Sequence, residues 1–287
     1  FEEAAIKVAA QYEGMKAYKT GEELIAAPEV QAVVITSSDP SHAGYVLESL
    51  KAGKFVFCEK PLAQNAGDCE KIIAAETAHG RRLLQVGFMR RYDRGYAEMK
   101  RIIDSGELGA PLMIHACHRN VSQPDGFQTE MGVSNVAIHE LDICRWLLGD
   151  EYESAQVLKV RQSACSTKGY DNPQIVLLET KSGARIDVEV QVADAYGYDI
   201  QCQVVCEKGT VNLPDPYAVV KRANASRSFP ILTDWKDRFI EAYDIELSHW
   251  VKTLEEKGEP DGPSAWDGYA ACVAADTLNR SRGTNQF

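Results

Sequence analysis

Short apolar runs alternate with helical patterns through the first half of the chain, and this rhythm constrains the fold most strongly. The run 32–36, Ala-Val-Val-Ile-Thr, has the β-branched composition of a strand that is buried on both faces. A helix that begins at Pro40 and ends near Lys51 follows it, with Gly53 at the usual position after a helix. With short connections, strand and helix patterns then alternate at 54–58, 66–78, 83–87 and 94–105. This alternation is typical of a parallel, doubly wound α/β sheet.

The second half has a different pattern, in which strands follow one another. A strand at 113–118 and a helix at about 135–148 come first. Strand patterns then occupy 154–161, 175–179, 184–192, 198–206 and 209–213, and helices return at 235–256 and 264–280. Successive strands with glycine turns are typical of an antiparallel sheet. We therefore expect an α/β domain at 1–116 and an α+β domain with a large open antiparallel sheet at 117–287.

A dinucleotide-binding sheet normally begins with a strand, a Gly-x-Gly-x-x-Gly turn and a helix. The sequence contains no such turn and begins in a helical pattern at Phe1. We interpret the first βαβ unit as missing from the sequence. The alternative is a protein that never had this unit and binds no dinucleotide.

The charge balance argues against two classes of partner. The 287 residues carry a net charge of −11. No basic stripe is available to neutralise the phosphates of a nucleic acid or of an anionic membrane. No apolar run approaches the ~18 residues that a membrane-spanning helix needs. We therefore expect neither nucleic acid nor a membrane as a partner.

The eight cysteines are scattered, with no Cys-x-x-Cys pair. Cys202 and Cys206 lie four residues apart in a strand pattern, but no second pair completes a zinc site. Most of the cysteines stand in apolar segments, as small buried side chains do. Such cysteines are typical of a reducing compartment, so we expect a cytoplasmic protein without a metal site.

The tripeptide Glu59-Lys60-Pro61 directly follows the apolar strand pattern 55–58. Ligands and catalytic groups of open α/β sheets lie beyond the carboxyl ends of the strands. A lysine there changes its pKa readily when it is partly buried beside a carboxylate or a cofactor. Lys60 is therefore a candidate functional residue. The alternative is a surface lysine in a loop before a helix.

The polar run 36–42, Thr-Ser-Ser-Asp-Pro-Ser-His, follows the buried strand at 32–36. Small hydroxyl side chains at this edge suit the ribose or phosphate of a cofactor. The alternative is a loop that only caps a helix, with Ser38 or Asp39 as N-cap and Pro40 in the first turn. Both interpretations can hold together.

The segment 135–142 predicts a helix with one polar face. In an α-helix, Asn135, His139 and Asp142 lie on the same side, at positions i, i+4 and i+7. This pattern on an otherwise apolar helix indicates a functional histidine. One alternative is a half-buried, hydrogen-bonded structural histidine. A zinc site of His139, Asp142 and one remote ligand is a weaker alternative, because no third ligand has an informative spacing.

These motifs, in this order, resemble the glucose-fructose oxidoreductase/inositol dehydrogenase (Gfo/Idh/MocA) family. The resemblance covers essentially the whole chain, and its later segments are similar to myo-inositol 2-dehydrogenases in particular. The residues that carry it are 33–36, Pro40, His42, 52–63, 85–93, 111–115, 139–142, 196–202 and 262–269.

The resemblance implies a Rossmann dinucleotide-binding domain followed by an α+β substrate domain. It implies NAD-dependent oxidation of a secondary alcohol of myo-inositol, or of a related cyclic polyol, to a ketone. The family uses the lysine of Glu-Lys-Pro with an aspartate and a histidine four residues apart on a helix. These positions correspond to Lys60, Asn135 and His139, so an asparagine replaces the usual aspartate. NADP is the alternative cofactor, since the residue that selects NAD is expected upstream of Phe1.

The resemblance also implies two sets of binding residues and an assembly. Polyol contacts are expected from Lys60, Arg90, His118, Asn120, Asn135, His139, Tyr198 and Tyr243. Cofactor contacts are expected from Thr36, Ser37, Ser38, Pro40, His42, Glu59, Lys60, Pro61, Met89 and Arg90. Many substrate hydroxyls need both donors and acceptors, and the first set supplies both. The family further implies a homotetramer in which the second-domain sheets pack together.

The implied chemistry agrees with the residue types. Hydride leaves a carbinol carbon only if the hydroxyl proton also leaves, and a neutral imidazole at His139 can take that proton. An ammonium at Lys60 can stabilise the developing alkoxide. Asn135 can orient the imidazole but supplies no charge. We therefore expect the pKa of His139 to lie nearer its ordinary value than it would beside an aspartate, unless Asp142 compensates.

Two other functions remain as alternatives. The first is a dehydrogenase of another cyclic polyol or aldose on the same fold. The second is a sugar- or cofactor-binding protein without catalysis, which Asn135 and the missing glycine turn suggest.

Overall fold

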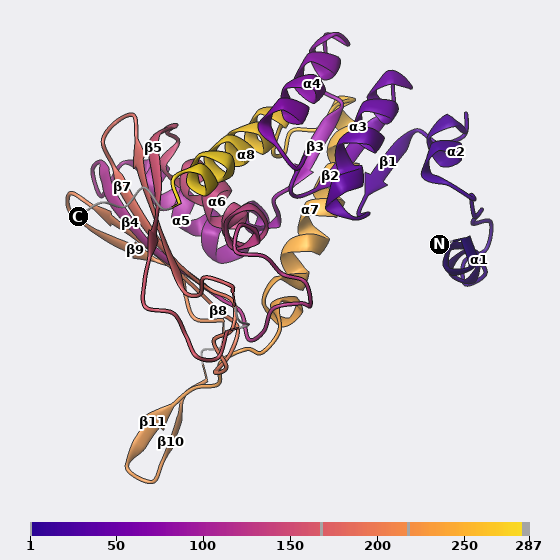
Figure 1. Ribbon diagram of the computed structural model, residues 1–287. Coiled ribbons are helices and arrows are strands. Elements are labelled where there is room, and N and C mark those ends of the chain that lie inside the picture. The colour runs from indigo at the N-terminus through magenta and orange to yellow at the C-terminus, as the bar shows by residue number, and fades with distance from the viewer. Residues whose placement is uncertain (1, 167–168, 217–218, 283–287) are drawn as a thin grey trace. The chain divides into compact units, whose positions relative to one another are not determined.

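The computed structural model describes residues 2–166, 169–216 and 219–282 (Figure 1). The chain forms two compact units. Unit 1 comprises residues 1–87 and 250–269, and unit 2 comprises residues 88–249 and 270–287. The domain boundary expected between residues 116 and 117 stays a prediction.

Unit 1 is built on a three-stranded parallel sheet in the order β1-β2-β3. Its strands are β1 (Ala32–Ile35), β2 (Phe55–Glu59) and β3 (Leu84–Gly87). Its first helices are α1 (Glu2–Ala9), α2 (Gly21–Ala26), η1 (Asp39–Ser41), α3 (His42–Lys51) and α4 (Ala66–Thr77). Helix α3 packs on β1 and β2 and against α4. The predicted parallel arrangement is confirmed, and the carboxyl ends of the three strands lie at one edge.

Unit 2 is built on a six-stranded sheet in the order β5-β6-β7-β4-β8-β9. Its strands are β4 (Pro111–Arg119), β5 (Tyr152–Lys159), β6 (Gln174–Thr180), β7 (Arg185–Gln191), β8 (Asp199–Cys206) and β9 (Gly209–Asn212). Four of the neighbouring pairs are antiparallel, as expected, but β4 and β7 are parallel, so the sheet is mixed. The strand pattern of β4 does not reveal this, because side-chain alternation is the same in both kinds of pairing.

The helices of unit 2 cover one face of its sheet. They are η2 (Met89–Tyr92), α5 (Arg94–Ser105), the π-helical segment η3 (Gly132–Ala137) and α6 (Ile138–Leu148). Contacts join α5 to β9, η3 to β7 and α6 to β4. Alternate strand residues such as Ile114, Val188 and Val204 are buried beneath them. The opposite face carries ion pairs, including those of His115 with Asp187 and Arg119 with Glu189.

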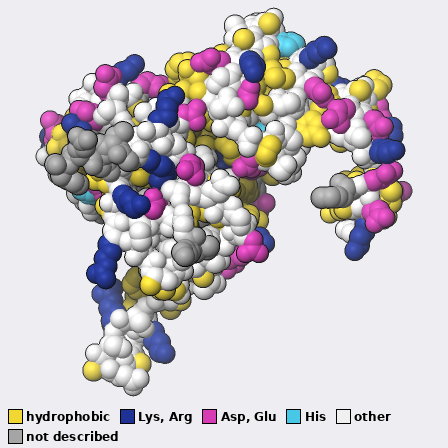
Figure 2. Space-filling view, in the orientation of Figure 1, with side chains coloured by type: hydrophobic (Ala, Val, Ile, Leu, Met, Phe, Trp, Pro, Cys, Tyr) yellow, Lys and Arg dark blue, Asp and Glu magenta, His cyan; other side chains and the backbone are white. Residues whose placement is uncertain are grey.

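Two long helices and a hairpin complete the chain. Helix α7 (Trp235–Lys257) and helix α8 (Ala265–Arg280) each contribute residues to both units. The hairpin of β10 (Lys221–Ala223) and β11 (Ser226–Ser228) forms its own two-stranded sheet in unit 2. Basic side chains gather along it in Figure 2, where Lys221, Arg222 and Arg227 are exposed. In the part of the chain that the structure describes, no helix combines the length and apolar character of a membrane span.

Helix α5 is held at its start by Asp93. The carboxylate accepts hydrogen bonds from the backbone N–H groups of Gly95 and Tyr96, both at 3.1 Å. It also pairs with the nearly buried Arg238, through contacts of 2.5 and 3.2 Å. The side chain thus caps a helix and neutralises a cation that lies far away in the sequence.

Replacing Asp93 by alanine is expected to lower the free energy of unfolding by about 2–4 kcal/mol, because both the cap and the buried ion pair are lost. Asp93→Asn keeps the capping oxygen and loses only the charge, so its loss should be smaller. Denaturant unfolding followed by circular dichroism measures both variants. An alanine variant as stable as the wild type would contradict this account of Asp93.

Candidate active site

Two loops at the carboxyl edge of the unit 1 sheet are tied together by His42. Its Nδ1 lies 2.8 Å from the carbonyl oxygen of Pro61, and its Nε2 lies 3.0 Å from that of Ser37. The loop after β1 is thereby joined to the loop after β2. The ring is 1% exposed, so His42 holds the two loops in place from a buried position.

Lys60 follows the carboxyl end of β2, as the sequence predicts. Its backbone N–H donates to the carboxylate of Glu59 at 3.2 Å. Burial raises the pKa of Glu59, and the charge of Lys60 partly offsets this effect. A Cβ at Gly87 would lie 3.0 Å from Oε1 of Glu59, so the glycine makes room for the carboxylate between β2 and β3. Lys60 itself is half-buried.

The hydroxyl run after β1 is exposed at the same edge. Oγ of Ser37 lies 2.6 Å from Oγ of Ser41, which donates to the carbonyl oxygen of Ser38 at 2.7 Å. Neither Ser38 nor Ser41 makes a side-chain capping bond, and α3 begins at His42 rather than at Pro40. Ser38 nevertheless stands at the N-cap position of η1 and Pro40 lies in its first turn, so the capping alternative holds in its positions but not in its side-chain bond. Exposed hydroxyls at this edge fit the ribose and phosphate oxygens of a dinucleotide.

Unit 2 contains a buried ionic cluster of Arg90, His118 and Glu140, whose side chains are 1%, 5% and 1% exposed. Nη1 of Arg90 donates to Oε1 of Glu140. Nδ1 of His118 lies 2.9 Å from Oε2 of Glu140 and 3.2 Å from Nη2 of Arg90. Burial opposes ionisation of Glu140, but Arg90 and His118 outweigh it and lower the pKa of this carboxyl group. The carboxylate therefore bridges a guanidinium and an imidazole.

Aromatic rings surround this cluster. The ring of Tyr198 stands edge-on to that of His118, with centroids 6.1 Å apart, and burial raises the pKa of Tyr198 to about 12. The ring of His139 lies 6.2 Å from that of His118. The guanidinium of Arg90 lies 5.3 Å above Phe239. His118, His139, Arg90 and Tyr198 were all predicted to serve one site, and unit 2 brings them together.

The predicted polar helix face is divided in the structure. Asn135 lies in the π-helical segment, and only His139 and Asp142 belong to the regular helix α6. The expectation of regular α-helical spacing from Asn135 is wrong, because a π-helix has more residues per turn. Both oxygens of Asp142 accept from Arg91, at 2.9 and 2.5 Å. Asp142 is therefore part of an ion pair with Arg91, which weakens the idea that it compensates for Asn135.

The remaining predicted residues occupy varied positions. Asn120 follows β4 and is anchored through its backbone to Gln191 and Asp194. Tyr243 lies on α7, with its ring 5.6 Å from that of Trp235. Met89 is buried in η2, Thr36 is exposed after β1 and Pro61 is buried after β2. The roles of all these side chains stay predictions.

Sequence reasoning missed Glu140. A signal was available, because Glu140 lies four residues from both Val136 and Cys144 and so falls on the apolar stripe of the helix. A carboxylate at a core position needs a buried cation, and that requirement could have pointed to Arg90.

Metal and cysteine chemistry receive no support from the described residues. Among them, no group of three His, Cys, Asp or Glu side chains is arranged to hold a metal ion. All eight cysteines are free thiols, and all except Cys165 are buried.

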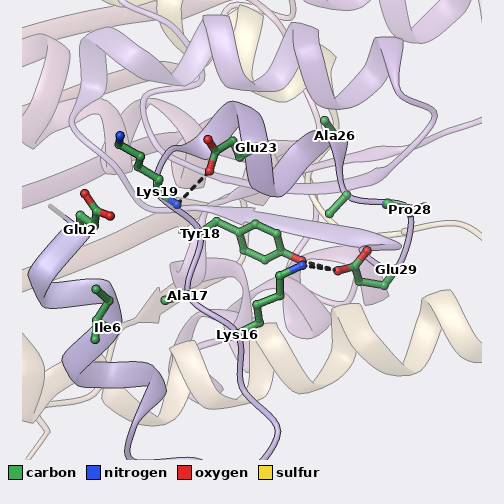
Figure 3. Close-up of a pocket in the computed structure, with 11 residues that line it drawn as sticks. Glu2, Ile6, Lys16, Ala17, Tyr18, Lys19, Glu23, Ala26, Pro28 and Glu29 are labelled. Atoms are coloured by element: carbon green, nitrogen blue, oxygen red, sulfur yellow. Dashed lines mark hydrogen bonds and ion pairs between the residues drawn. The ribbon is translucent and has the colours of Figure 1, made fainter.

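A separate surface pocket of about 590 Å³ lies in unit 1 (Figure 3). Lys16 and Tyr18 point into it, and both contact Oε1 of Glu29, at 3.0 and 2.8 Å. None of the predicted site residues lines this pocket. The pocket is therefore separate from the candidate site.

Comparison with known proteins agrees with this arrangement. Residues 2–88 match the NAD-binding Rossmann fold of the GFO_IDH_MocA oxidoreductase family, and residues 100–286 match its C-terminal alpha/beta domain. The chain is 55% identical to the inositol 2-dehydrogenase of Ralstonia nicotianae, over 92% of this chain and 78% of that protein. It is 51% identical to the inositol 2-dehydrogenase of Pseudomonas fluorescens, over 99% and 85%.

A solved structure gives the same result in three dimensions. The myo-inositol dehydrogenase of Lactobacillus casei, in complex with NAD(H) and myo-inositol, aligns with a TM-score of 0.95 and 37% identity. The alignment covers 99% of this chain and 85% of that one. With family matches across nearly all of its residues, the chain belongs to the GFO_IDH_MocA oxidoreductase family.

Proposed function

We propose that this protein is an NAD-dependent dehydrogenase that oxidises a ring hydroxyl of an inositol to a ketone. The observation that carries the proposal is the 55% identity to an inositol 2-dehydrogenase over 92% of the chain. The Lactobacillus casei structure supports it, since that protein holds both NAD(H) and myo-inositol.

The buried cluster of unit 2 supports a polyol as the substrate. A polyol presents several hydroxyls, each of which both donates and accepts. Arg90 supplies donors, and His118, His139 and Tyr198 supply groups that can do either. The cluster is fixed by Glu140 before any ligand binds, which reduces the entropy lost on binding.

We assign the chemical step to three residues. His139 takes the hydroxyl proton as the hydride leaves the same carbon. Lys60 stabilises the negative charge that develops on the oxygen. Asn135 orients the imidazole of His139. The bound nicotinamide supplies the hydride acceptor, and the hydroxyl run with Lys60 at the edge of unit 1 holds this cofactor.

The experiment is a turnover assay with the whole protein, NAD and a panel of inositols and aldoses, followed at the absorbance band of NADH. Oxidation of myo-inositol or a related inositol is the expected result. Activity on aldoses alone would favour a sugar dehydrogenase on the same fold. Cofactor binding without any turnover would favour a non-catalytic binding protein. Replacing NAD with NADP in the same assay decides the cofactor preference.

Asn135→Asp is expected to move the acid limb of the pH profile of kcat/KM to higher pH. A carboxylate beside His139 favours its protonated form, so the imidazole becomes unavailable as a base at a higher pH than in the wild type. Asp142 pairs with Arg91, which offsets its charge. Profiles of the two proteins measured side by side test the idea, and coincident acid limbs would refute it.

We further propose a homotetramer in a cytoplasmic setting. The helix-free face of the unit 2 sheet supports assembly, because it combines ion pairs with an exposed apolar side chain, Met113. The buried, free cysteines support a reducing compartment. Light scattering coupled to size-exclusion chromatography measures the assembly, and a monomer at micromolar concentration would refute it.

A further inference from the structure

We propose that Glu140 is a positioning residue that holds His118 in the tautomer with its proton on Nδ1. In this tautomer, Nε2 carries the lone pair that accepts a hydrogen bond from a substrate hydroxyl. The inference rests on the proposed function for the identity of that hydroxyl. The tautomer itself follows from the geometry of the cluster.

Nδ1 of His118 has two neighbours that demand opposite roles. Arg90 can only donate, whereas an ionised Glu140 can only accept. The carboxylate oxygen lies at 2.9 Å and the guanidinium nitrogen at 3.2 Å. Arg90 is already neutralised through its Nη1 contact with the other carboxylate oxygen. The closer, charge-assisted partner decides the role of Nδ1, which donates to Glu140.

Burial makes this choice strong. The side chains of Arg90 and Glu140 are each 1% exposed, so water does not replace a lost partner. An Nδ1 without its proton would place a lone pair 2.9 Å from a carboxylate, which is repulsive in a medium of low dielectric constant.

Glu140 is close to two of the histidines of unit 2, His118 and His139. Glu140 directly follows His139 on α6, and the two imidazole centroids lie 6.2 Å apart. Among the described residues, the titratable and charged groups seen around His118 include Arg90 from η2, Glu140 and His139 from α6, and Tyr198 ahead of β8. Of these four groups, Glu140 carries the negative charge, and that charge favours a proton on Nδ1.

The direct test is the ring ¹⁵N spectrum of His118 in the whole protein, assigned by loss of its signals in His118→Gln. The wild type is expected to show a protonated Nδ1 and an unprotonated Nε2. In Glu140→Gln the charge is gone, and Arg90 can then donate to Nδ1. The proton should therefore move to Nε2 in the variant.

The kinetic test compares KM with kcat in the same variant. Glu140→Gln is expected to raise the KM for inositol by about 10-fold or more, because a buried acceptor for the substrate hydroxyl is lost. The dissociation constant for NADH should stay within about 2-fold, since no cofactor contact is removed. Glu140→Asp keeps the charge and should retain the wild-type tautomer with part of the affinity.

Asp142→Asn is the matched control, because it also removes a buried, arginine-paired carboxylate from α6. It should lower the melting temperature but leave the spectrum of His118 and the KM unchanged. Three results would overturn the proposal: an Nε2-protonated His118 in the wild type, an unchanged tautomer in Glu140→Gln, or the same shift in Asp142→Asn. The spectrum needs no turnover, so it decides the tautomer even if the proposed substrate is wrong.

Discussion

Replacing Lys60 by methionine is expected to lower kcat for inositol oxidation by about 100-fold to 1,000-fold. The substitution keeps the length of the side chain and removes the ammonium that stabilises the developing alkoxide. Because that charge develops mainly in the transition state, the loss should fall on kcat more than on KM. Steady-state kinetics with NAD and inositol, combined with NADH binding by fluorescence, measures both quantities.

Lys54 provides the control, because it flanks the other end of β2. It lies at the amino end of β2, where its Nζ donates to the carbonyl oxygens of Ala27 and Val30. Lys54→Met should lower the melting temperature and leave kcat within about 2-fold, since catalytic groups of such sheets lie at the carboxyl edge. A Lys60→Met enzyme with kcat within 10-fold of the wild type would remove Lys60 from the proposed mechanism.

His139→Gln is expected to lower kcat/KM by about 100-fold to 10,000-fold, which is the range associated with loss of a general base. Glutamine retains hydrogen-bonding ability but cannot take up the hydroxyl proton. The acid limb of the pH profile should therefore disappear together with most of the activity. Initial rates across the pH range, at saturating NAD, measure both effects.

The exposed His79 serves as the control for this substitution. His79→Gln should retain the wild-type rate and the wild-type profile. A His139→Gln enzyme that keeps its acid limb would show that another group titrates there, and His118 would be the first candidate because its ring lies 6.2 Å away.

Local patterning was sufficient for most of the fold. The apolar runs that became β2 and β3 are largely buried, as strands of a parallel sheet are. The expectation of burial on both faces is wrong for β1, because Ala32 and Val34 are exposed. Helix α5 occupies the predicted residues and α4 ends one residue earlier than predicted, and an N-cap residue marks the start of each. The pairing of strands was harder to predict from the sequence, because β4 pairs in parallel with β7, which lies about 70 residues further along the chain. The sequence pattern of one strand carries no information about such a partner.

The candidate site, too, was only partly predictable from the sequence. The sequence identified Lys60, because a strand followed by Glu-Lys-Pro places it at the carboxyl edge by local geometry alone. It also identified His118 and His139, but it could not show that their rings approach each other. The local sequence could not predict the role of Glu140, since its partners lie 50 and 22 residues away in the sequence.

The sequence by itself determined the secondary structure, the family and the residue types available for catalysis, because these depend on short-range periodicity and on motifs of a few residues. Only the tertiary structure decided which charges neutralise one another. Asp142 became the partner of Arg91, while Glu140 became the partner of Arg90 and His118. The physical reason is that ion pairing depends on distance in space and on burial, and both are set when η2, β4 and α6 pack together.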